Sequence, residues 1–352
     1  MNLAEFDYHL PEELIAQEAL ADRAGSRMLV VHREEGRWED RRFREFPEFL
    51  RAGDCLVLND SRVFPARLFG HRSGVHALPI GRRNPKRREY LSGEVEVFLL
   101  RPASSGGRDW EALVRPGRKM PVGERIRFGD DLEAEIVGRG EFGERTLRFA
   151  GTDDLFAKFE KIGHVPLPPY IRRADTAADR DRYQTVFARE RGSVAAPTAG
   201  LHFTPEILDA CRRQGADIAS VTLHVGLGTF QPLHAERVED AHLHAERYSI
   251  GTESAARMRA ASRRVTVGTT SVRAIETAWR TGKWSGETDI FIYPGQSFLA
   301  TGAMLTNFHL PLTSLLLLVC AFAGTELTLA AYRHAVDERY RFYSYGDCML
   351  IV

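Results

Sequence analysis

Strand-like and helix-like patterns alternate at the two ends of the chain. Near the N-terminus, Pro11 to Leu20 predicts a short helix, and Met28 to Val31 and GDCLVLND (Gly53 to Asp60) predict strands. After Asp153 the alternation resumes, with helices after Thr204, near Ser254 to Arg263, from Ser271, from Pro311 to Gly324 and around Leu329, Tyr332, Val336 and Tyr340, and strands at Ile218 to Val225, Val265 to Gly268, Thr288 to Tyr293 and Cys348 to Val352. This order predicts an α/β fold with a largely parallel sheet covered on both faces.

The middle of the chain has a different pattern. Between about Phe64 and Phe149 the apolar positions alternate in short runs, such as EVEVFLLRP, LEAEIVGRG and RTLRFAG, which are separated by Gly, Pro and charged residues. No helical periodicity is visible there, and short, evenly spaced strands of this kind are typical of a small antiparallel barrel. We predict a sheet-and-helix α/β domain formed by both chain ends, residues 1–69 and 151–352, with an inserted antiparallel β-barrel domain at residues 70–150.

The charge balance limits the way in which nucleic acid can be bound. The 352 residues include 48 basic and 48 acidic side chains, so the formal net charge is zero. A protein that binds nucleic acid mainly through bulk electrostatics normally carries a basic excess. A local basic face remains possible, and the candidate run is Arg82, Arg83, Lys86, Arg87 and Arg88. Such runs are more often solvated loops than binding sites.

Cysteine spacing and hydropathy predict the compartment. The four cysteines are scattered without a C-x-x-C pair, which predicts reduced thiols and neither a zinc site nor a disulfide framework. The N-terminal stretch lacks a signal-type apolar segment, and the longest apolar run, Leu315 to Ala323, is too short to cross a bilayer. We expect a cytoplasmic protein without a membrane segment.

The common catalytic signatures are absent from the sequence. It contains no H-E-x-x-H, Walker loop, G-x-S-x-G or three-cysteine cluster. His242, His244 and Glu246 could face one way from a strand and bind a metal. No other ligand cluster accompanies them, so we predict no metal site.

Polar, glycine-rich segments follow several predicted strands. In an open α/β sheet, ligands bind beyond the carboxyl ends of the strands. The segments are HVGLGTFQP, GTTSVR, YPGQSF and TNFHLP, and their candidate binding residues are Gly226, Gly228, Thr229, Thr269, Thr270, Ser271, Arg273, Tyr293, Asn307 and Phe308. Each segment alone could be a turn or a helix cap, but their common position at one sheet edge favours a binding site.

A fifth segment, AAPTAGLHFT (Ala195 to Thr204), places small residues ahead of His202. Small residues allow the backbone to approach a ligand closely. A lone histidine in such a place is more often structural than catalytic, so His202 is a candidate only together with the other segments.

These segments are also the ones that carry a family resemblance. FDYHLPEELIAQ, GDCLVLNDSRVFPARL, GHVPLPPYIRR, AAPTAGLHFT, HVGLGTFQP, GTTSVRAIE, TNFHLP and YRFYSYGDCMLI closely resemble, in this order, the S-adenosylmethionine:tRNA ribosyltransferase-isomerase family of the queuosine pathway. The resemblance extends from Phe6 to Ile351 and implies an α/β domain with an inserted barrel. The chain departs from the expected pattern at Gly25, Gln296, Gly302 and Leu312, and we assign no role to those positions.

The resemblance implies a reaction. The family joins the ribosyl moiety of S-adenosylmethionine to a 7-aminomethyl-7-deazaguanine at the wobble position of tRNA, giving epoxyqueuosine and releasing adenine and methionine. Such a site needs a base, an acid and an aromatic or acidic face for the sulfonium. Candidate acids and bases are Glu246, His202, His309 and His224, and candidate aromatic faces are Tyr293, Phe308 and Tyr345. Arg273 with the GTTS turn could hold the methionine carboxylate or a tRNA phosphate.

The expected partners follow from the same resemblance. They are S-adenosylmethionine, as a co-substrate in a reaction without a cofactor, and the anticodon stem-loop of a tRNA that bears the deazaguanine precursor. We expect a monomer. Two alternatives remain open at this point: a non-catalytic tRNA-binding module and an S-adenosylmethionine-dependent RNA methyltransferase. A methyltransferase would normally carry a G-x-G turn after its first strand, and none occurs here.

Overall fold

The chain forms two compact units. The structure, a computed structural model, describes residues 1–352 apart from 74–92, 104–106, 141–142, 153, 227–232 and 234. One unit comprises Met1–Arg62 and Pro168–Val352, and the other comprises Val63–Leu167. The first is built on a nine-stranded sheet and the second is a closed barrel, so the predicted fold class is confirmed.

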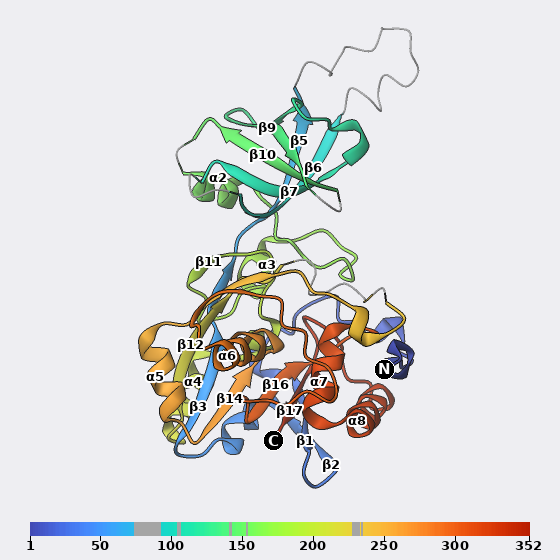
Figure 1. Ribbon diagram of the computed structural model, residues 1–352, viewed down its shortest axis with the longest axis vertical. Coiled ribbons are helices and arrows are strands. Elements are labelled where there is room, and N and C mark those ends of the chain that lie inside the picture. The colour runs from blue at the N-terminus through green and yellow to red at the C-terminus, as the bar shows by residue number, and fades with distance from the viewer. Residues whose placement is uncertain (74–92, 104–106, 141–142, 153, 227–232, 234) are drawn as a thin grey trace. The chain divides into compact units, whose positions relative to one another are not determined.

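The nine-stranded sheet combines segments from both chain ends (Figure 1). Its order is β15 (Ser285–Thr288), β13 (Glu246–Ser249), β12 (Asp217–Leu223), β3 (Asp54–Asn59), β14 (Arg263–Val267), β16 (Ala303–Asn307), β17 (Cys348–Ile351), β1 (Arg27–His32) and β2 (Arg37–Arg42). The four central strands β12, β3, β14 and β16 are mutually parallel. Antiparallel pairings flank them, so the sheet is mixed and is parallel mainly at its centre.

Both faces of this sheet are buried along its inner strands β1, β3, β16 and β17, which carry buried residues at consecutive positions. In β1, Leu29 and Val31 pack with the helices α7 and α8, whereas Met28 and Val30 pack on the opposite face with α4. The helices of this unit are α3 (Ala177–Arg182), α4 (Pro205–Arg213), α5 (Thr252–Ala260), α6 (Thr269–Thr281), α7 (Ser314–Ala323) and α8 (Thr325–Asp337). As predicted, Thr204 caps α4 through its side chain.

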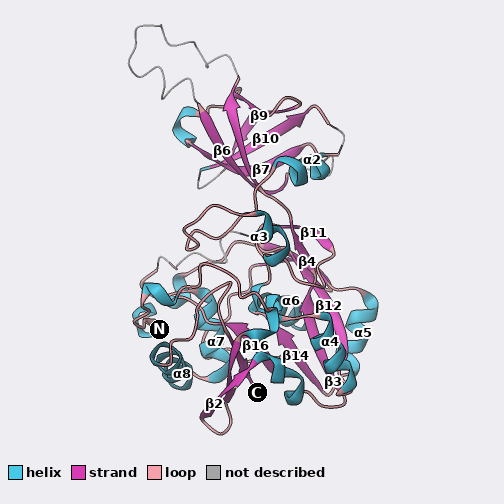
Figure 2. Ribbon diagram, turned by 180° about the vertical axis from the view of Figure 1, so that it is seen from behind, coloured by secondary structure: helices cyan, strands magenta, loops and turns pink. Residues whose placement is uncertain are grey.

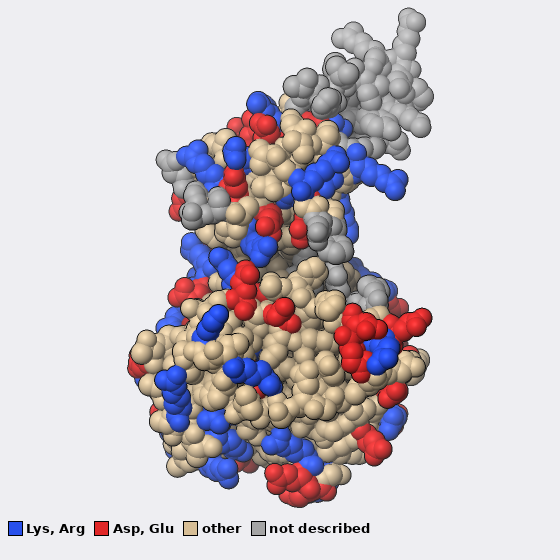
Figure 3. All heavy atoms as spheres, viewed as in Figure 1, with Lys and Arg blue, Asp and Glu red and all other residues tan. Residues whose placement is uncertain are grey.

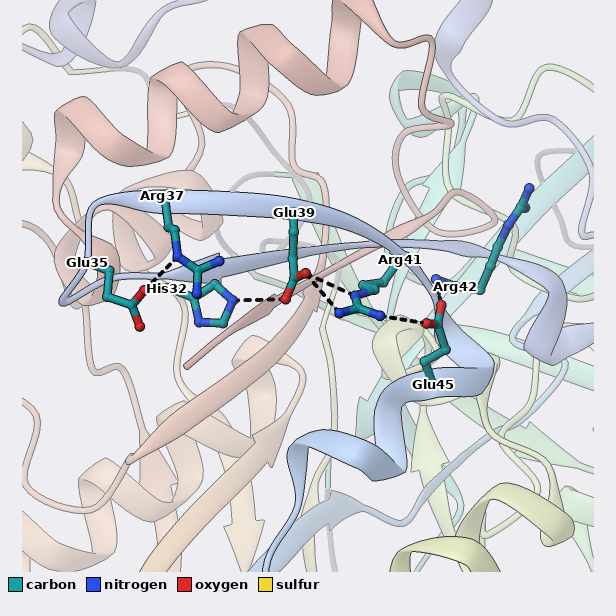
Figure 4. A network of polar contacts seen from close by, with 7 residues as sticks. All are labelled: His32, Glu35, Arg37, Glu39, Arg41, Arg42 and Glu45. Carbon is teal, nitrogen blue, oxygen red and sulfur yellow. Dashed lines mark hydrogen bonds and ion pairs between the residues drawn. The ribbon is translucent and has the colours of Figure 1, made fainter.

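At one margin of the sheet, β2 is covered by charged side chains. Glu39 lies between His32 and Arg41, and Arg41 also contacts Glu45 (Figure 4). These residues, with Glu35, Arg37 and Arg42, form what we call the β2 network. Charged side chains along an edge strand discourage pairing with another chain.

The second unit is a closed antiparallel barrel (Figure 2). Its strands, in order around the barrel, are β10 (Glu144–Ala150), β7 (Asp109–Arg115), β6 (Glu94–Pro102), β5 (Arg67–Arg72), β8 (Arg125–Phe128) and β9 (Leu132–Arg139). Buried and partly exposed residues alternate along β6, β7 and β9, which is the pattern that predicted the barrel. Among the described residues from Glu94 to Phe149 no α-helix forms, and the helical residues are the 3₁₀ turn Gly117–Lys119 and the 3₁₀ residue Gly143.

A short helix, α2 (Leu155–Ile162), belongs to the barrel unit. Its Phe159 ring packs edge-on against Trp110 and Phe149 of the barrel, with ring centroids 5.2 Å apart in both pairs. Because α2 packs on the barrel, the barrel unit extends to Leu167, whereas the predicted barrel domain ended at residue 150. The small sheet formed by β4 (Ser61–Val63) and β11 (Glu190–Ser193) completes the strands.

The predicted helix at Pro11 to Leu20 is wrong. Only the 3₁₀ turn Glu12–Leu14 forms there. The backbone of the segment bonds instead to the distant Phe342, whose N–H donates to Leu14 and whose carbonyl accepts from Ala16. A long-range ladder therefore replaces the local helical bonds.

The predicted strand at Thr288 to Tyr293 is also wrong, because β15 ends at Thr288. The Thr288 hydroxyl accepts the N–H of Ile290 and hydrogen-bonds to Thr277, so the chain turns away from the ladder. The apolar Ile290 and Ile292 pack against the core beside α7 instead. In the same way, Tyr340 lies beyond the end of α8 at Asp337.

The distribution of charge on the surface agrees with the neutral composition, and the lengths of the helices agree with the short apolar runs of the sequence. Lys and Arg are interspersed with Asp and Glu on the face drawn in Figure 3. Within the described residues, no single helix is long and apolar enough to cross a membrane, and α7 and α8 reach that length only together, across a bend of 116°.

Candidate functional site

The carboxyl ends of the parallel strands β12, β3, β14 and β16 meet at one edge of the sheet. A pocket with about 450 Å³ of empty space, part of it open to solvent, lies at this edge. Its lining combines small and polar residues, namely Ala196, Pro197, Thr198, Ala199, Val225, Gly268, Thr269, Thr270, Thr306, Asn307, Phe308, His309, Leu315, Tyr343 and Ser344. Three of the predicted segments, AAPTAGLHF, GTTSVR and TNFHLP, are therefore brought together here.

The N-terminus of α6 forms one wall of the pocket. Gly268, which ends the strand segment with φ of +85°, allows the sharp change from strand to helix. The Gly268 carbonyl accepts the N–H groups of Ser271 and Val272 at 3.1 and 3.3 Å. The first N–H groups of a helix have no acceptor within it, and α6 has no side-chain cap. The helix thus presents N–H donors at the pocket.

His202 and Asn307 form a buried chain of hydrogen bonds beside the pocket. The Asn307 amide nitrogen lies 3.0 Å from the Tyr343 carbonyl and 3.3 Å from His202 Nε2, and His202 Nδ1 lies 2.9 Å from the Ser26 hydroxyl. Burial lowers the pKa of His202 to about 4, so the ring is neutral at neutral pH. Because the amide nitrogen can only donate, Nε2 of His202 accepts and Nδ1 donates to Ser26.

His309 borders the pocket directly. Its Nε2 lies 2.8 Å from the Thr306 hydroxyl, its backbone N–H donates to the Tyr332 hydroxyl at 3.2 Å, and its carbonyl accepts from Tyr8. The ring is buried, which lowers its pKa to about 3. His309 is therefore neutral at neutral pH and is held on three sides.

Glu246 and Arg273 form a buried ion pair and are not part of the pocket lining. Each side chain is at most 5% exposed. The second carboxylate oxygen of Glu246 accepts the backbone N–H of Gly226 at 2.8 Å, and the Arg273 guanidinium also donates to the Ile290 carbonyl. The pair thus holds the chain at Gly226, next to residues 227–232.

The remaining candidates lie in several places. Phe308 is fully buried against Tyr332, Tyr340 and Phe342. The Tyr345 hydroxyl donates to Asp179 at 2.8 Å, and Tyr293 packs beside Phe291. Gly228 and Thr229 lie outside the described residues, as does the basic run of residues 82 to 88.

His224 and Ser271 differ in whether their polar side-chain atoms already have hydrogen-bond partners. The His224 ring lies against Gly192, its pKa is lowered by burial, and its Nδ1 is buried without a partner. The Ser271 hydroxyl is used by its own helix, since it donates to the Val267 carbonyl at 2.7 Å.

Sequence reasoning missed several residues of this edge. Asn59, at the end of β3, bonds to the Leu223 backbone and to the Thr270 hydroxyl, and Tyr343 and Ser344 line the pocket. Tyr343 has φ of +74°, a conformation that costs free energy outside glycine and is enriched at functional sites. Two signals were present in the sequence: the polar Asn59-Asp60 step after an apolar strand, and the family motif YRFYSYGDCMLI, which contains Tyr343 and Ser344.

No metal centre is found in the part of the chain that the structure describes. His, Cys, Asp and Glu side chains do not gather there in groups of three or more that could hold an ion. His242 and His244 lie in the segment before β13 and do not join Glu246 in such a group.

Comparisons with known proteins agree with the motifs. A family model described as queuosine biosynthesis protein matches residues 3–351. The chain is 74% identical over 352 residues to an S-adenosylmethionine:tRNA ribosyltransferase-isomerase of Solibacter usitatus (strain Ellin6076), covering 100% of both chains. Identity to the Moorella thermoacetica enzyme of the same name is 48% over 362 residues, again with 100% of both chains covered.

A solved structure is similar to this chain over nearly its full length. The crystal structure of S-adenosylmethionine tRNA ribosyltransferase from Thermotoga maritima matches 99% of this chain and 100% of its own, with 37% identity and a TM-score of 0.54. Family model, relatives and solved structure all extend over nearly the full length. The chain therefore belongs to the S-adenosylmethionine:tRNA ribosyltransferase-isomerase family, as its motifs predicted.

Proposed function

We propose that this chain transfers the ribosyl moiety of S-adenosylmethionine to the 7-aminomethyl-7-deazaguanine at the wobble position of tRNA. The product is epoxyqueuosine-tRNA, and adenine and methionine are released. The observation that carries this conclusion is 74% identity over the entire length to an S-adenosylmethionine:tRNA ribosyltransferase-isomerase.

The chemistry of the substrates defines what the site must do. The sulfonium of S-adenosylmethionine acidifies the neighbouring ribose 5′ carbon, so that a base can form a stabilised carbanion there. Departing adenine needs a proton or strong hydrogen bonds at its ring nitrogens. A pocket lined by neutral hydrogen-bonding groups at the sheet edge supports this use.

His309 is the candidate acid–base group with the best access, because it lines the pocket and its ring is fixed through Thr306. His202 fits a positioning role, since its partners are Asn307 and Ser26. Glu246 also fits a positioning role, because Arg273 and Gly226 occupy its two oxygens. In this assignment Glu246 holds the backbone at Gly226, Phe308 lines the pocket, and His224, Tyr293 and Tyr345 act from outside its lining.

Adenine release tests the function. The purified chain is incubated with S-adenosylmethionine and tRNA that carries the aminomethyl deazaguanine, and the bases released and the tRNA nucleosides are separated and weighed by mass spectrometry. We expect one adenine per epoxyqueuosine formed, and none with tRNA that lacks the precursor. Formation of S-adenosylhomocysteine would indicate methyl transfer, and tRNA binding without turnover would indicate a binding module.

The finer expectations belong to the same proposal. We expect a monomeric, cytoplasmic enzyme that uses S-adenosylmethionine as co-substrate and needs no cofactor. Treatment with EDTA followed by dialysis should leave the rate of adenine release within about twofold of the untreated enzyme, provided that the tRNA stays folded. Loss of activity that zinc or magnesium restores would contradict this expectation, and sedimentation velocity tests the monomer.

A further inference from the structure

Two features of the pocket are not used by the protein itself. One is the N-terminus of α6, a helix of 13 residues, and the other is the amide oxygen of Asn307. The helix N-terminus follows β14 and Asn307 ends β16, and these two strands are parallel neighbours. The Gly268 N–H continues the pairing, since it donates to the Leu305 carbonyl at 2.8 Å. Adjacent strands are about 4.8 Å apart, so a small ligand can reach both features at once.

The helix side supplies fixed donors. The hydrogen bonds among the described residues leave the N–H groups of Thr269 and Thr270 without an acceptor. The Thr270 hydroxyl accepts from the Asn59 amide nitrogen at 3.2 Å. Asn59 cannot be flipped, because its oxygen accepts the N–H groups of Ser61 and Leu223. The Thr270 proton is therefore directed away from Asn59 and adds to the positive end of the helix.

The Asn307 side supplies a fixed acceptor. The Tyr343 carbonyl can only accept, so it determines which end of the Asn307 amide faces it. The second amide hydrogen points to His202 Nε2. The Asn307 oxygen is left buried without a partner, in a side chain that is 2% exposed and lines the pocket. A buried acceptor of this kind is costly unless a ligand satisfies it.

We propose that this pocket binds the amino-acid end of S-adenosylmethionine, with the α-carboxylate at the N-terminus of α6 and the α-ammonium at the Asn307 oxygen. Donors and an acceptor side by side match a zwitterion. A tRNA phosphate would match only the donors and would bring its negative charge against the Asn307 oxygen. The small side chains of Ala196 and Ala199 leave room for close approach. This assignment rests on the proposed function, which supplies the ligand.

The test is a crossed comparison of three ligands. Binding is measured by calorimetry for S-adenosylmethionine, its decarboxylated analogue and its desamino analogue, with unmodified tRNA present so that no turnover occurs. With the parent chain we expect each analogue to bind about 10- to 100-fold more weakly, the range for one hydrogen bond to a charged group. Thr270→Val should reduce the preference for the carboxylate by about tenfold and leave the preference for the ammonium unchanged. Asn307→Leu should do the reverse.

Thr277→Val is the matched control, because Thr277 is a buried threonine of the same helix that bonds to Thr288 and is not part of the pocket lining. It should alter neither preference.

The proposal is wrong if both analogues bind to the parent as tightly as S-adenosylmethionine, if S-adenosylmethionine itself does not bind, or if the two variants weaken the binding of all three ligands equally. Adenine release by the parent is scored separately, so failure of the proposed function is distinguishable from failure of this site.

Discussion

The polar side chains of the β2 network are partly exposed and paired with one another, whereas those around the pocket are buried and not all of them have a partner. In the β2 network, Glu39 is 3.1 Å from His32 and 3.0 Å from Arg41, and these side chains are between 17% and 38% exposed. Around the pocket, Asn307 and His309 are buried, and Asn307 keeps an unpartnered oxygen. Water reaches the exposed partners of the first group, whereas a buried polar group in the second is costly to leave without a partner. Buried polar atoms without a partner also occur elsewhere in the described residues, but Asn307 combines such an atom with a place in the pocket lining, and this combination indicates the functional region.

The largest expected difference concerns the same substitution in a buried and an exposed pair. Glu246→Gln leaves the Arg273 charge buried without its partner, which should lower the free energy of unfolding by about 3–5 kcal/mol. Glu39→Gln in the β2 network is the control. Urea denaturation of both variants measures the difference.

The same variant decides the role of Glu246 in catalysis. If this carboxylate is the base, Glu246→Gln should lower kcat by roughly 100-fold or more with little change in melting temperature. If it is a positioning residue, the melting temperature should fall, and the remaining folded fraction should turn over at a rate near that of the parent. We expect the second outcome, because both carboxylate oxygens already have partners.

The next effect compares two histidines. His309→Gln removes the acid–base group that lines the pocket but keeps an amide able to bond to Thr306, so kcat should fall by roughly 100-fold with a small change in melting temperature. His32→Gln, in the β2 network, should change kcat by less than about twofold. Equal kcat values for the two variants would remove His309 from the mechanism and favour His202.

A smaller effect is expected in the pH dependence of stability. Burial lowers the pKa of His202 to about 4 and that of His309 to about 3, from 6.5. At a pH between the folded and the unfolded pKa of each histidine, the unfolded chain binds more protons than the folded chain. The contribution of the two neutral histidines to the free energy of unfolding is therefore complete above about pH 6.5 and is lost as the pH falls. Each histidine should contribute a slope of about 1.4 kcal/mol per pH unit near pH 5. His309→Gln should remove its share of the slope, and an unchanged slope would contradict the burial argument.

The smallest effect is expected within the β2 network itself. Glu39→Gln should cost roughly 0–1 kcal/mol of unfolding free energy, and about 1 M NaCl should abolish even that difference because salt screens exposed charges. A loss as large as that of Glu246→Gln would mean that exposure does not separate the two regions.

The sequence predicted correctly those elements whose formation depends on residues close to one another in the chain. The barrel followed from period-two alternation, and the α4 start followed from Thr204 and Pro205, which form the cap and first position that the structure shows. The helix at Pro11 to Leu20 failed because that backbone pairs with Phe342 more than 300 residues away, and no local propensity encodes such a partner.

The site could be predicted only in part for the same reason. The motifs indicated GTTSVR, AAPTAGLHF and TNFHLP, and the pocket brings them together. They did not indicate the contacts of Ser26 or Asn59, which are made with residues 176 and 211 positions away. Nor could the sequence show that Glu246 and Arg273 neutralise each other, since that depends on β13 and α6 meeting in the fold.

The central claim, that substrate contacts the pocket and not the other polar regions, is tested most directly by hydrogen–deuterium exchange with and without S-adenosylmethionine, with unmodified tRNA present in both samples. We predict that S-adenosylmethionine slows exchange in residues 196–199, 268–270, 306–309 and 343–344, and leaves residues 32–45 of the β2 network unchanged. Protection confined to residues outside the four pocket segments would contradict the claim and place the S-adenosylmethionine site elsewhere in the chain.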